Sequence, residues 1–151
     1  MMTWSYIRIQ TCNTTNAEYF SGTNLLNCSF LASDIEYCQN QGKAVTISLG
    51  GGGASVGFTD DSEAQSFADQ IWNVFLGGSS DNRPFGSVVL DGFVFIDAAS
   101  CVRLIESYSV DLDIEGGSET GYAAFITQLR THFTGADKRW ACGVAWAAAR
   151  Y

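Results

Sequence analysis

The 151-residue chain has few basic residues, one proline and one histidine. Only 8 Lys and Arg stand against 16 Asp and Glu, so the formal net charge is −8, which argues against a nucleic-acid partner. The lone His132 and five widely spaced cysteines form neither a histidine cluster nor a zinc knuckle, so we expect no metal and no other cofactor. The single proline, Pro84, indicates a loop rather than a domain linker.

Long apolar runs are also missing. Asp91, Asp97 and Arg103 interrupt the most apolar stretch before it reaches the roughly 18 residues that a membrane helix needs. We therefore expect no membrane partner. Residues 1–10 lack the basic-then-apolar order of a secretory signal, so none is visible. With 46% apolar and 16% charged residues, the composition predicts one compact, acidic, folded domain.

Two glycosylation sequons lie in the cysteine-bearing first part of the chain. They are Asn13-Thr14-Thr15 and Asn27-Cys28-Ser29. Sequons together with cysteines favour a secreted ancestry, although sequons alone also occur by chance.

The apolar pattern predicts strands that alternate with helices. Residues 43–49 (KAVTISL) form a β-branched run that ends at four glycines, which is typical of a buried strand. A capping box of Ser62 and Gln65 predicts the start of a helix that Gly77 and Gly78 end. The other expected elements are a short helix over 30–39, a strand that starts at 88–90, a helix over 122–133 and a strand within 139–146.

Such alternation predicts an α/β fold with a parallel sheet covered by helices on both faces. The countable strands are too few for a closed eight-stranded barrel, which needs about 250 residues. We therefore expect residues 1–151 to be one domain and only part of its parent fold.

Residues 110–115 (VDLDIE) alternate apolar and acidic side chains, so a strand there would carry Asp111, Asp113 and Glu115 on one face. The plainer interpretation is a strand with its acidic face in water. Against it, no basic residue alternates with the acids, and Gly116-Gly117 follow where active-site loops of α/β folds begin. Crowded carboxylates would raise the pKa of one acid, as a general acid requires.

These residues resemble the signature Asp-Gly-x-Asp-x-Asp-x-Glu of glycoside hydrolase family 18. Asp91-Gly92 supply its opening and residues 110–115 its remainder, with the 17 residues of 93–109 between them. Residues 48–51 (SLGG) match the family's Ser-x-Gly-Gly motif. Segments 71–80, 83–86 and 121–125 look like fungal and plant class III chitinases. The resemblance covers 26–139 and implies a fragment of a TIM (β/α)8 barrel, with residues 1–10 and 140–151 departing from the family and further strands absent.

The 17 residues of 93–109 have a hypothesis of their own. An intron begins with the dinucleotide GT and ends with AG. The codons of Gly92 to Val94 can contain the GT, and the codon of Ser109 can contain the AG. Removing the bases from this GT through this AG restores a glycine codon in frame. We interpret 93–109 as an unspliced intron. A genuine loop inserted in mid-strand is the competing interpretation, and it has little of the turn chemistry that a loop there needs.

The resemblance implies a role for each motif residue. Glu115 would be the general acid, Asp113 would hold the substrate's acetamido group, and Asp111 would share a proton with Asp113. Gly50 and Gly51 would let sugar approach the backbone. The resemblance also implies a Cys12–Cys28 disulfide, and a partner for Cys38 outside the chain.

The leading interpretation is therefore a truncated chitinase that cleaves β-1,4-linked N-acetylglucosamine polymers by an endo-type, substrate-assisted retaining mechanism, with its activity impaired by truncation. Its partner would be chitin or a chito-oligosaccharide, with no obligate protein partner, and by resemblance it would be extracellular. The alternative is an inactive chitin-binding fragment or pseudogene product, because a half barrel exposes strand edges and holds catalytic groups poorly.

Overall fold

The structure of the chain is a computed structural model that describes residues 12, 18–23, 25–50, 57–96, 111–112 and 120–134. For residues 48–50, 93–96 and 111–112 it describes the backbone alone. The elements, in chain order, are the 3-10 helix η3 (Ser29–Leu31), α1 (Ala32–Asn40), β1 (Thr46–Gly50), α2 (Asp61–Phe75), β2 (Gly92–Ile96), β3 (Asp111–Leu112) and α3 (Tyr122–Phe133).

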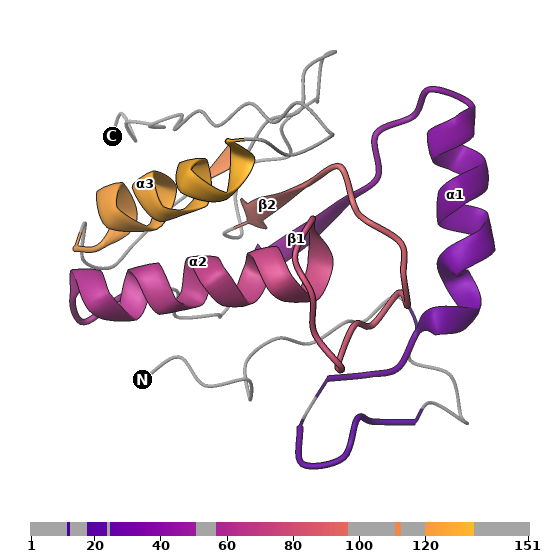
Figure 1. Cartoon of the computed structure of the whole chain (residues 1–151), viewed down its shortest axis with the longest axis horizontal. Coiled ribbons are helices and arrows are strands. Elements are labelled where there is room, and N and C mark those ends of the chain that lie inside the picture. Colours follow the sequence, from indigo (N-terminus) through magenta and orange to yellow (C-terminus); the bar gives the residue numbers. More distant parts are fainter. Residues whose placement is uncertain are drawn as a thin grey trace, which may run out of the picture.

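The three strands form one parallel sheet in the order β1-β2-β3. In Figure 1, α2 and α3 lie side by side, and α1 stands apart from them. This arrangement confirms the α/β class and the parallel pairing that the sequence predicts. In the described part of the chain, no helix is long and apolar enough to cross a membrane.

Helix α2 begins earlier than the sequence pattern predicted. Its N-cap is Asp60, whose Oδ1 accepts a hydrogen bond from the Glu63 backbone N–H at 2.8 Å. The Glu63 carboxylate in turn accepts from the backbone N–H of Thr59 at 2.7 Å. The predicted capping box of Ser62 and Gln65 is therefore wrong, because an aspartate two residues earlier satisfies the free N–H groups of the first turn.

Aromatic side chains join α2 to α3. Phe58 lies at the centre, with its ring centroid 5.2 Å from that of Tyr122, 5.7 Å from that of Phe125 and 5.9 Å from that of Phe67. All four are buried. Burial raises the pKa of the Tyr122 hydroxyl, because the ionised form would lose its water. The buried face of α3, which includes Tyr122 and Phe125, thus belongs to the core of the domain.

The far ends of the two helices meet through polar groups. Asp69 Oδ1 lies 2.6 Å from His132 Nε2 and accepts a hydrogen bond from Gln128 Nε2 at 2.8 Å. The His132 ring stacks on Trp72, with ring centroids 5.2 Å apart. His132 therefore fastens α3 to α2. Trp72 and Phe75 lie in the core.

The connection from α2 to β2 is organised by one guanidinium group. Arg83 donates five hydrogen bonds to backbone carbonyls, from Nε to Gly86, from Nη1 to Asn73 and Gly78, and from Nη2 to Leu76 and Val88, at 2.6 to 3.1 Å. These use every N–H that a guanidinium has. Three of the acceptors lie at or just beyond the end of α2, where helical carbonyls lack intrahelical partners. Burial lowers the pKa of the Arg83 guanidinium below its ordinary value.

Residues 88–90 do not start a strand, which corrects the prediction made from their apolar character. Val88 and Leu90 are buried, but the Leu90 N–H donates to the carbonyl of Phe75, the last residue of α2. Parallel pairing begins only at Gly92, opposite Thr46. The apolar run is tied to the helix end and enters the sheet two residues later.

Replacing Arg83 by lysine should destabilise the domain by about 2–4 kcal/mol, because one ammonium cannot reach carbonyls on three segments and buried acceptors lose their donors. Urea unfolding followed by circular dichroism measures the change. Arg130→Lys, the same exchange at an exposed position of α3, is the control and should cost less than about 0.5 kcal/mol. Equal losses in the two variants would contradict the role of Arg83.

Gly121→Ala should be more costly than Gly22→Ala. Both glycines have a positive φ, 82° and 74°, so alanine is strained at either. A Cβ at Gly121 would also lie 2.9 Å from the Cβ atoms of Ala64 and Phe58, whereas one at Gly22 would meet nothing within 4 Å. We expect losses of about 2–4 kcal/mol and about 1 kcal/mol respectively, measured by thermal unfolding. Similar losses would mean that α2 and α3 do not approach closely here.

Candidate functional site

The candidate site lies at the carboxyl edge of the sheet. Gly50, the last residue of β1, is the register partner of Ile96, the last residue of β2, so the two strands end together. Active sites of parallel α/β folds form at this edge. Gly50 is thus where the sequence predicted it, at a strand end. Gly51, Asp113 and Glu115 lie outside the described residues, as does the strand predicted within 139–146.

Asp111 stands on the strand beyond β2 and not on the strand next to Gly50. The parallel register of β2 and β3 sets Asp111 opposite Val94, and Leu112 opposite Phe95. In both pairs the partners are 17 positions apart, which equals the length of the segment 93–109. Asp111 and Leu112 are therefore level with residues that follow Gly92, but one strand further out.

Residues 93–96 take the strand position that follows Asp91-Gly92. They pair in register with β1 from Ile47 to Gly50. The first four residues of the segment 93–109 are therefore part of the sheet.

Asp91 is held at the amino end of β2 by hydrogen bonds on both sides. Its Oδ2 accepts from the Val45 backbone N–H and from Gln39 Nε2, each at 2.9 Å, and its own N–H donates to the Val45 carbonyl at 2.9 Å. The residue is 6% exposed. The carboxylate joins α1, the approach to β1 and the start of β2, and so sets the register between the two strands.

Gln39 is a positioning residue that the sequence did not single out. From α1 its Nε2 also donates to the Val89 carbonyl at 2.9 Å, so one amide holds two points of the segment that enters β2. A glutamine in the last turn of a polar helix gives no signal, because its partners lie 50 and 52 positions further along the chain. The role of Arg83 was missed for another reason: its acceptors are nearby backbone carbonyls, which no side-chain pattern in the sequence marks.

The disulfide that the resemblance implied is present. Cys12 and Cys28 are bonded, with Cα atoms 5.8 Å apart, and both are buried. Cys38 is exposed on α1 as a free thiol. Among the residues that the structure describes, no three His, Cys, Asp or Glu side chains gather in a way that could hold a metal ion.

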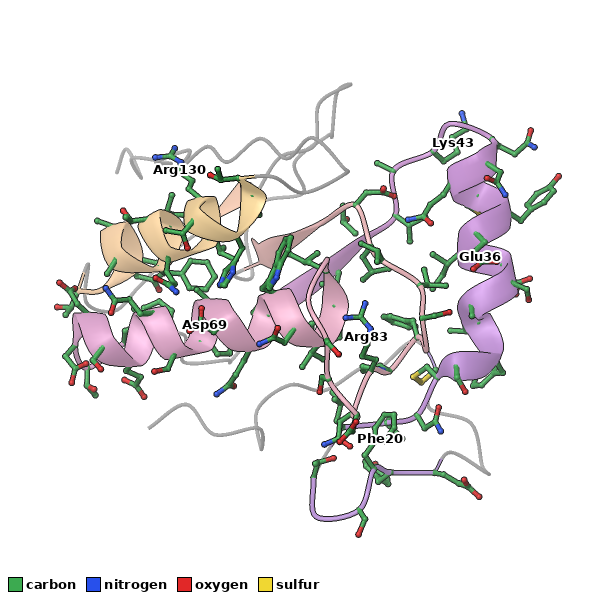
Figure 2. All side chains as sticks on the ribbon, in the orientation of Figure 1. Phe20, Glu36, Lys43, Asp69, Arg83 and Arg130 are labelled. Atoms are coloured by element: carbon green, nitrogen blue, oxygen red, sulfur yellow. A yellow bond between two sulfur atoms is a disulfide. The ribbon has the colours of Figure 1, made fainter. Side chains whose placement is uncertain are left out.

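An open hollow of about 350 Å³ lies on the other side of the domain from this edge. Its lining comes from two segments, one that leads into the first residue of η3 and one in the connection from α2 to β2: Phe20, Asn27, Ser29, Ser80, Asp81, Arg83, Gly86 and Ser87. Figure 2 shows Phe20 and Arg83 on this side, whereas the arrow of β2 in Figure 1 points away from it. The hollow thus belongs to the amino-terminal side of the sheet.

The chain is similar to several known proteins. Chitinase 1 of Rhizopus niveus is 50% identical over 117 residues, which is 76% of this chain and 20% of the relative. A chitinase from Ipomoea carnea shares the fold with a TM-score of 0.61 and 29% identity, over 85% of this chain and 45% of that one. The xylanase and α-amylase inhibitor protein XAIP-I, solved with trehalose, follows with a TM-score of 0.58 and 26% identity, over 84% and 43%.

No protein-family profile matches the chain. The similarities nevertheless define it as an α/β relative of the glycoside hydrolases. More narrowly, it is a partial homologue of the fungal chitinases, which confirms the resemblance to the class III type of glycoside hydrolase family 18. The chain spans about a fifth of the length of the curated relatives it matches.

Asp91→Ala should destabilise the domain by about 2–4 kcal/mol, since it leaves the Val45 N–H and the Gln39 amide without their shared acceptor. The amide hydrogen of Val45 should exchange faster, by a factor that corresponds to the same loss of free energy. Asp81→Ala, which removes an exposed loop carboxylate, is the control and should change little. Unchanged exchange at Val45 would contradict the clamp.

Proposed function

We propose that the chain is a segment of a chitinase and that the whole protein hydrolyses β-1,4-linked N-acetylglucosamine polymers. The observation that carries this proposal is the 50% identity to a fungal chitinase over 117 residues. The substrate is chitin or a chito-oligosaccharide, and the whole protein is secreted and cuts within the polymer. The three parallel strands form part of a TIM (β/α)8 barrel, whose carboxyl edge holds the active site.

The proposed chemistry needs no nucleophile from the protein. Glu115 protonates the oxygen between two sugar units, while the substrate's own acetamido carbonyl oxygen attacks the anomeric carbon. Asp113 holds that acetamido group and stabilises the positive intermediate, and Asp111 shares a proton with Asp113. Gly50 and Gly51, which have no Cβ, let the sugar approach the end of β1. Water then opens the intermediate, and the configuration at the anomeric carbon is retained.

We further propose that residues 93–109 are absent from the active enzyme because they are a translated intron. The register between β2 and β3 supports this. If Val110 followed Gly92 directly, the shift of 17 positions would move Asp111 to the place of Val94, opposite Ser48. Asp113 would move to the place of Ile96, opposite Gly50.

Glu115 would then follow the end of β2 by two residues. The sheet would keep its pairing with β1, and the three acids of the motif would reach the carboxyl edge beside Gly50. The general acid would stand where the active-site loops of such barrels begin. With 93–109 in the chain, the strand that contains Asp111 is instead separated from β1 by β2.

Hydrolysis of a fluorogenic chitotriose tests the proposal. The homologous segment of the Rhizopus niveus chitinase is replaced by this chain, either complete or without residues 93–109. The version without them should be active and the complete version should not, because only the first brings the motif to β1. Glu115→Gln in the active version should lower kcat at least about 100-fold with chitotriose binding retained.

Three results would count against the proposal. Equal activity with and without residues 93–109 would contradict the intron hypothesis. Unchanged kcat in Glu115→Gln would contradict its role as general acid. Sugar binding without turnover in every version would favour the alternative, an inactive chitin-binding fragment.

A further inference from the structure

The second sequon, Asn27-Cys28-Ser29, lies at the hollow on the amino-terminal side of the sheet. Asn27 is partly exposed and Ser29 exposed, so the sequon is at the surface. The Asn27 side-chain oxygen Oδ1 accepts a hydrogen bond from the Ser29 backbone N–H at 3.1 Å. Its amide nitrogen Nδ2 has no hydrogen-bond partner in the described part of the chain and is free to carry a substituent.

The backbone on both sides of Asn27 is fixed. The Asn27 N–H donates to the Glu18 carbonyl at 2.8 Å, and the Cys28 N–H donates to the Pro84 carbonyl at 2.8 Å. The second bond ties the sequon to the connection between α2 and β2, whose residues line the same hollow. A group attached to Asn27 would therefore start from a rigid base.

The lining of the hollow suits a sugar ring that bears an acetamido group. Phe20 supplies an aromatic ring for the apolar face of a pyranose. Around it, the hydroxyls of Ser29, Ser80 and Ser87 and the carboxylate of Asp81 offer hydrogen-bond donors and acceptors. The volume of about 350 Å³ leaves room for one sugar unit.

The neighbouring disulfide indicates the compartment. Cys28, the middle residue of the sequon, is bonded to Cys12, and such bonds form and persist in the secretory pathway. N-linked glycans are attached to Asn-x-Ser/Thr sequons of secreted proteins. Sequon, free amide, hollow and disulfide thus converge on one residue.

We propose that Asn27 carries an N-linked glycan whose first N-acetylglucosamine lies in the hollow beside Phe20. In the transfer, Nδ2 bonds to the anomeric carbon of a lipid-diphosphate-linked oligosaccharide. The carbon–oxygen bond to the diphosphate breaks, the lipid diphosphate leaves with the electron pair, and Nδ2 gives up one proton to a base. The glycan lies away from the carboxyl edge, so it leaves the proposed chitin site open.

Site-specific mass spectrometry tests the attachment. The full chain, with a cleavable secretion leader and with Asn13→Gln to remove the first sequon, is expressed in yeast, and total cell extract plus medium is treated with a peptide N-glycosidase. Conversion of Asn27 to aspartate marks a glycan at that position. We expect conversion in this chain and in Ser29→Thr, and none in Ser29→Ala. Since extract is included, a variant that fails to leave the cell is still read.

An unmodified Asn27 in both sequon-bearing chains would overturn the proposal. In that case, the protein made in bacteria, which carries no glycan, is tested for binding of free chitotriose. Binding that Phe20→Ala abolishes would mean that the hollow is a site for free saccharide instead.

Thermal unfolding before and after the glycosidase tests where the sugar lies. Removing the glycan should lower the unfolding midpoint of the parent chain. It should also lower that of the control variant Tyr37→Ala, which loses an exposed aromatic ring on α1 and keeps Phe20. In Phe20→Ala the midpoint should change much less. Equal decreases in all three would overturn the contact with Phe20.

Discussion

The arrangement of helices and strands depends on the guanidinium of Arg83. It lies between the end of α2 and the approach to β2, and its five N–H groups all donate to backbone carbonyls. No carboxylate is among these acceptors, so the group acts as a cap for the helix end and a brace for the loop rather than as an ion-pair partner. Because it links Asn73, Leu76 and Gly78 to Val88, it determines where the chain leaves α2 and from where it enters the sheet.

Asp91 continues this constraint into the sheet. Its carboxylate and its own N–H are both bonded to Val45, and Gln39 closes the contact from α1. Whatever follows Gly92 must therefore run beside β1 in the same register. In this chain Phe93 to Ile96 occupy that place, and Asp111 lies level with Val94 one strand away. The motif is thus divided in sequence, and Asp111 lies one strand further from β1 than the residues that follow Gly92, at the same level along the sheet.

Local patterns predicted most of the fold. The β-branched run before the four glycines gave β1, and the apolar spacings gave α2 and α3 within a few residues. The prediction of the α2 cap was wrong, because an aspartate can cap a helix as well as a serine can. The predicted start of β2 was wrong because Val88 and Leu90 are buried without pairing to another strand. Gln39 could not be found this way, since its partners are 50 and 52 positions away. Arg83 was missed because its partners, although near in sequence, are backbone carbonyls that carry no residue-type signal. The acidic motif, in contrast, could be found from the sequence, because it is defined by the spacing of residues within one strand.

The most direct measurement is of the junction in the mature protein. Peptide mass spectrometry of the enzyme from its natural source reads whether Gly92 is followed by Val110 or by Phe93. We expect the junction Asp91-Gly92-Val110-Asp111, which would bring the acids beside β1. A mature, chitin-hydrolysing product that contains residues 93–109 between the two halves would contradict it.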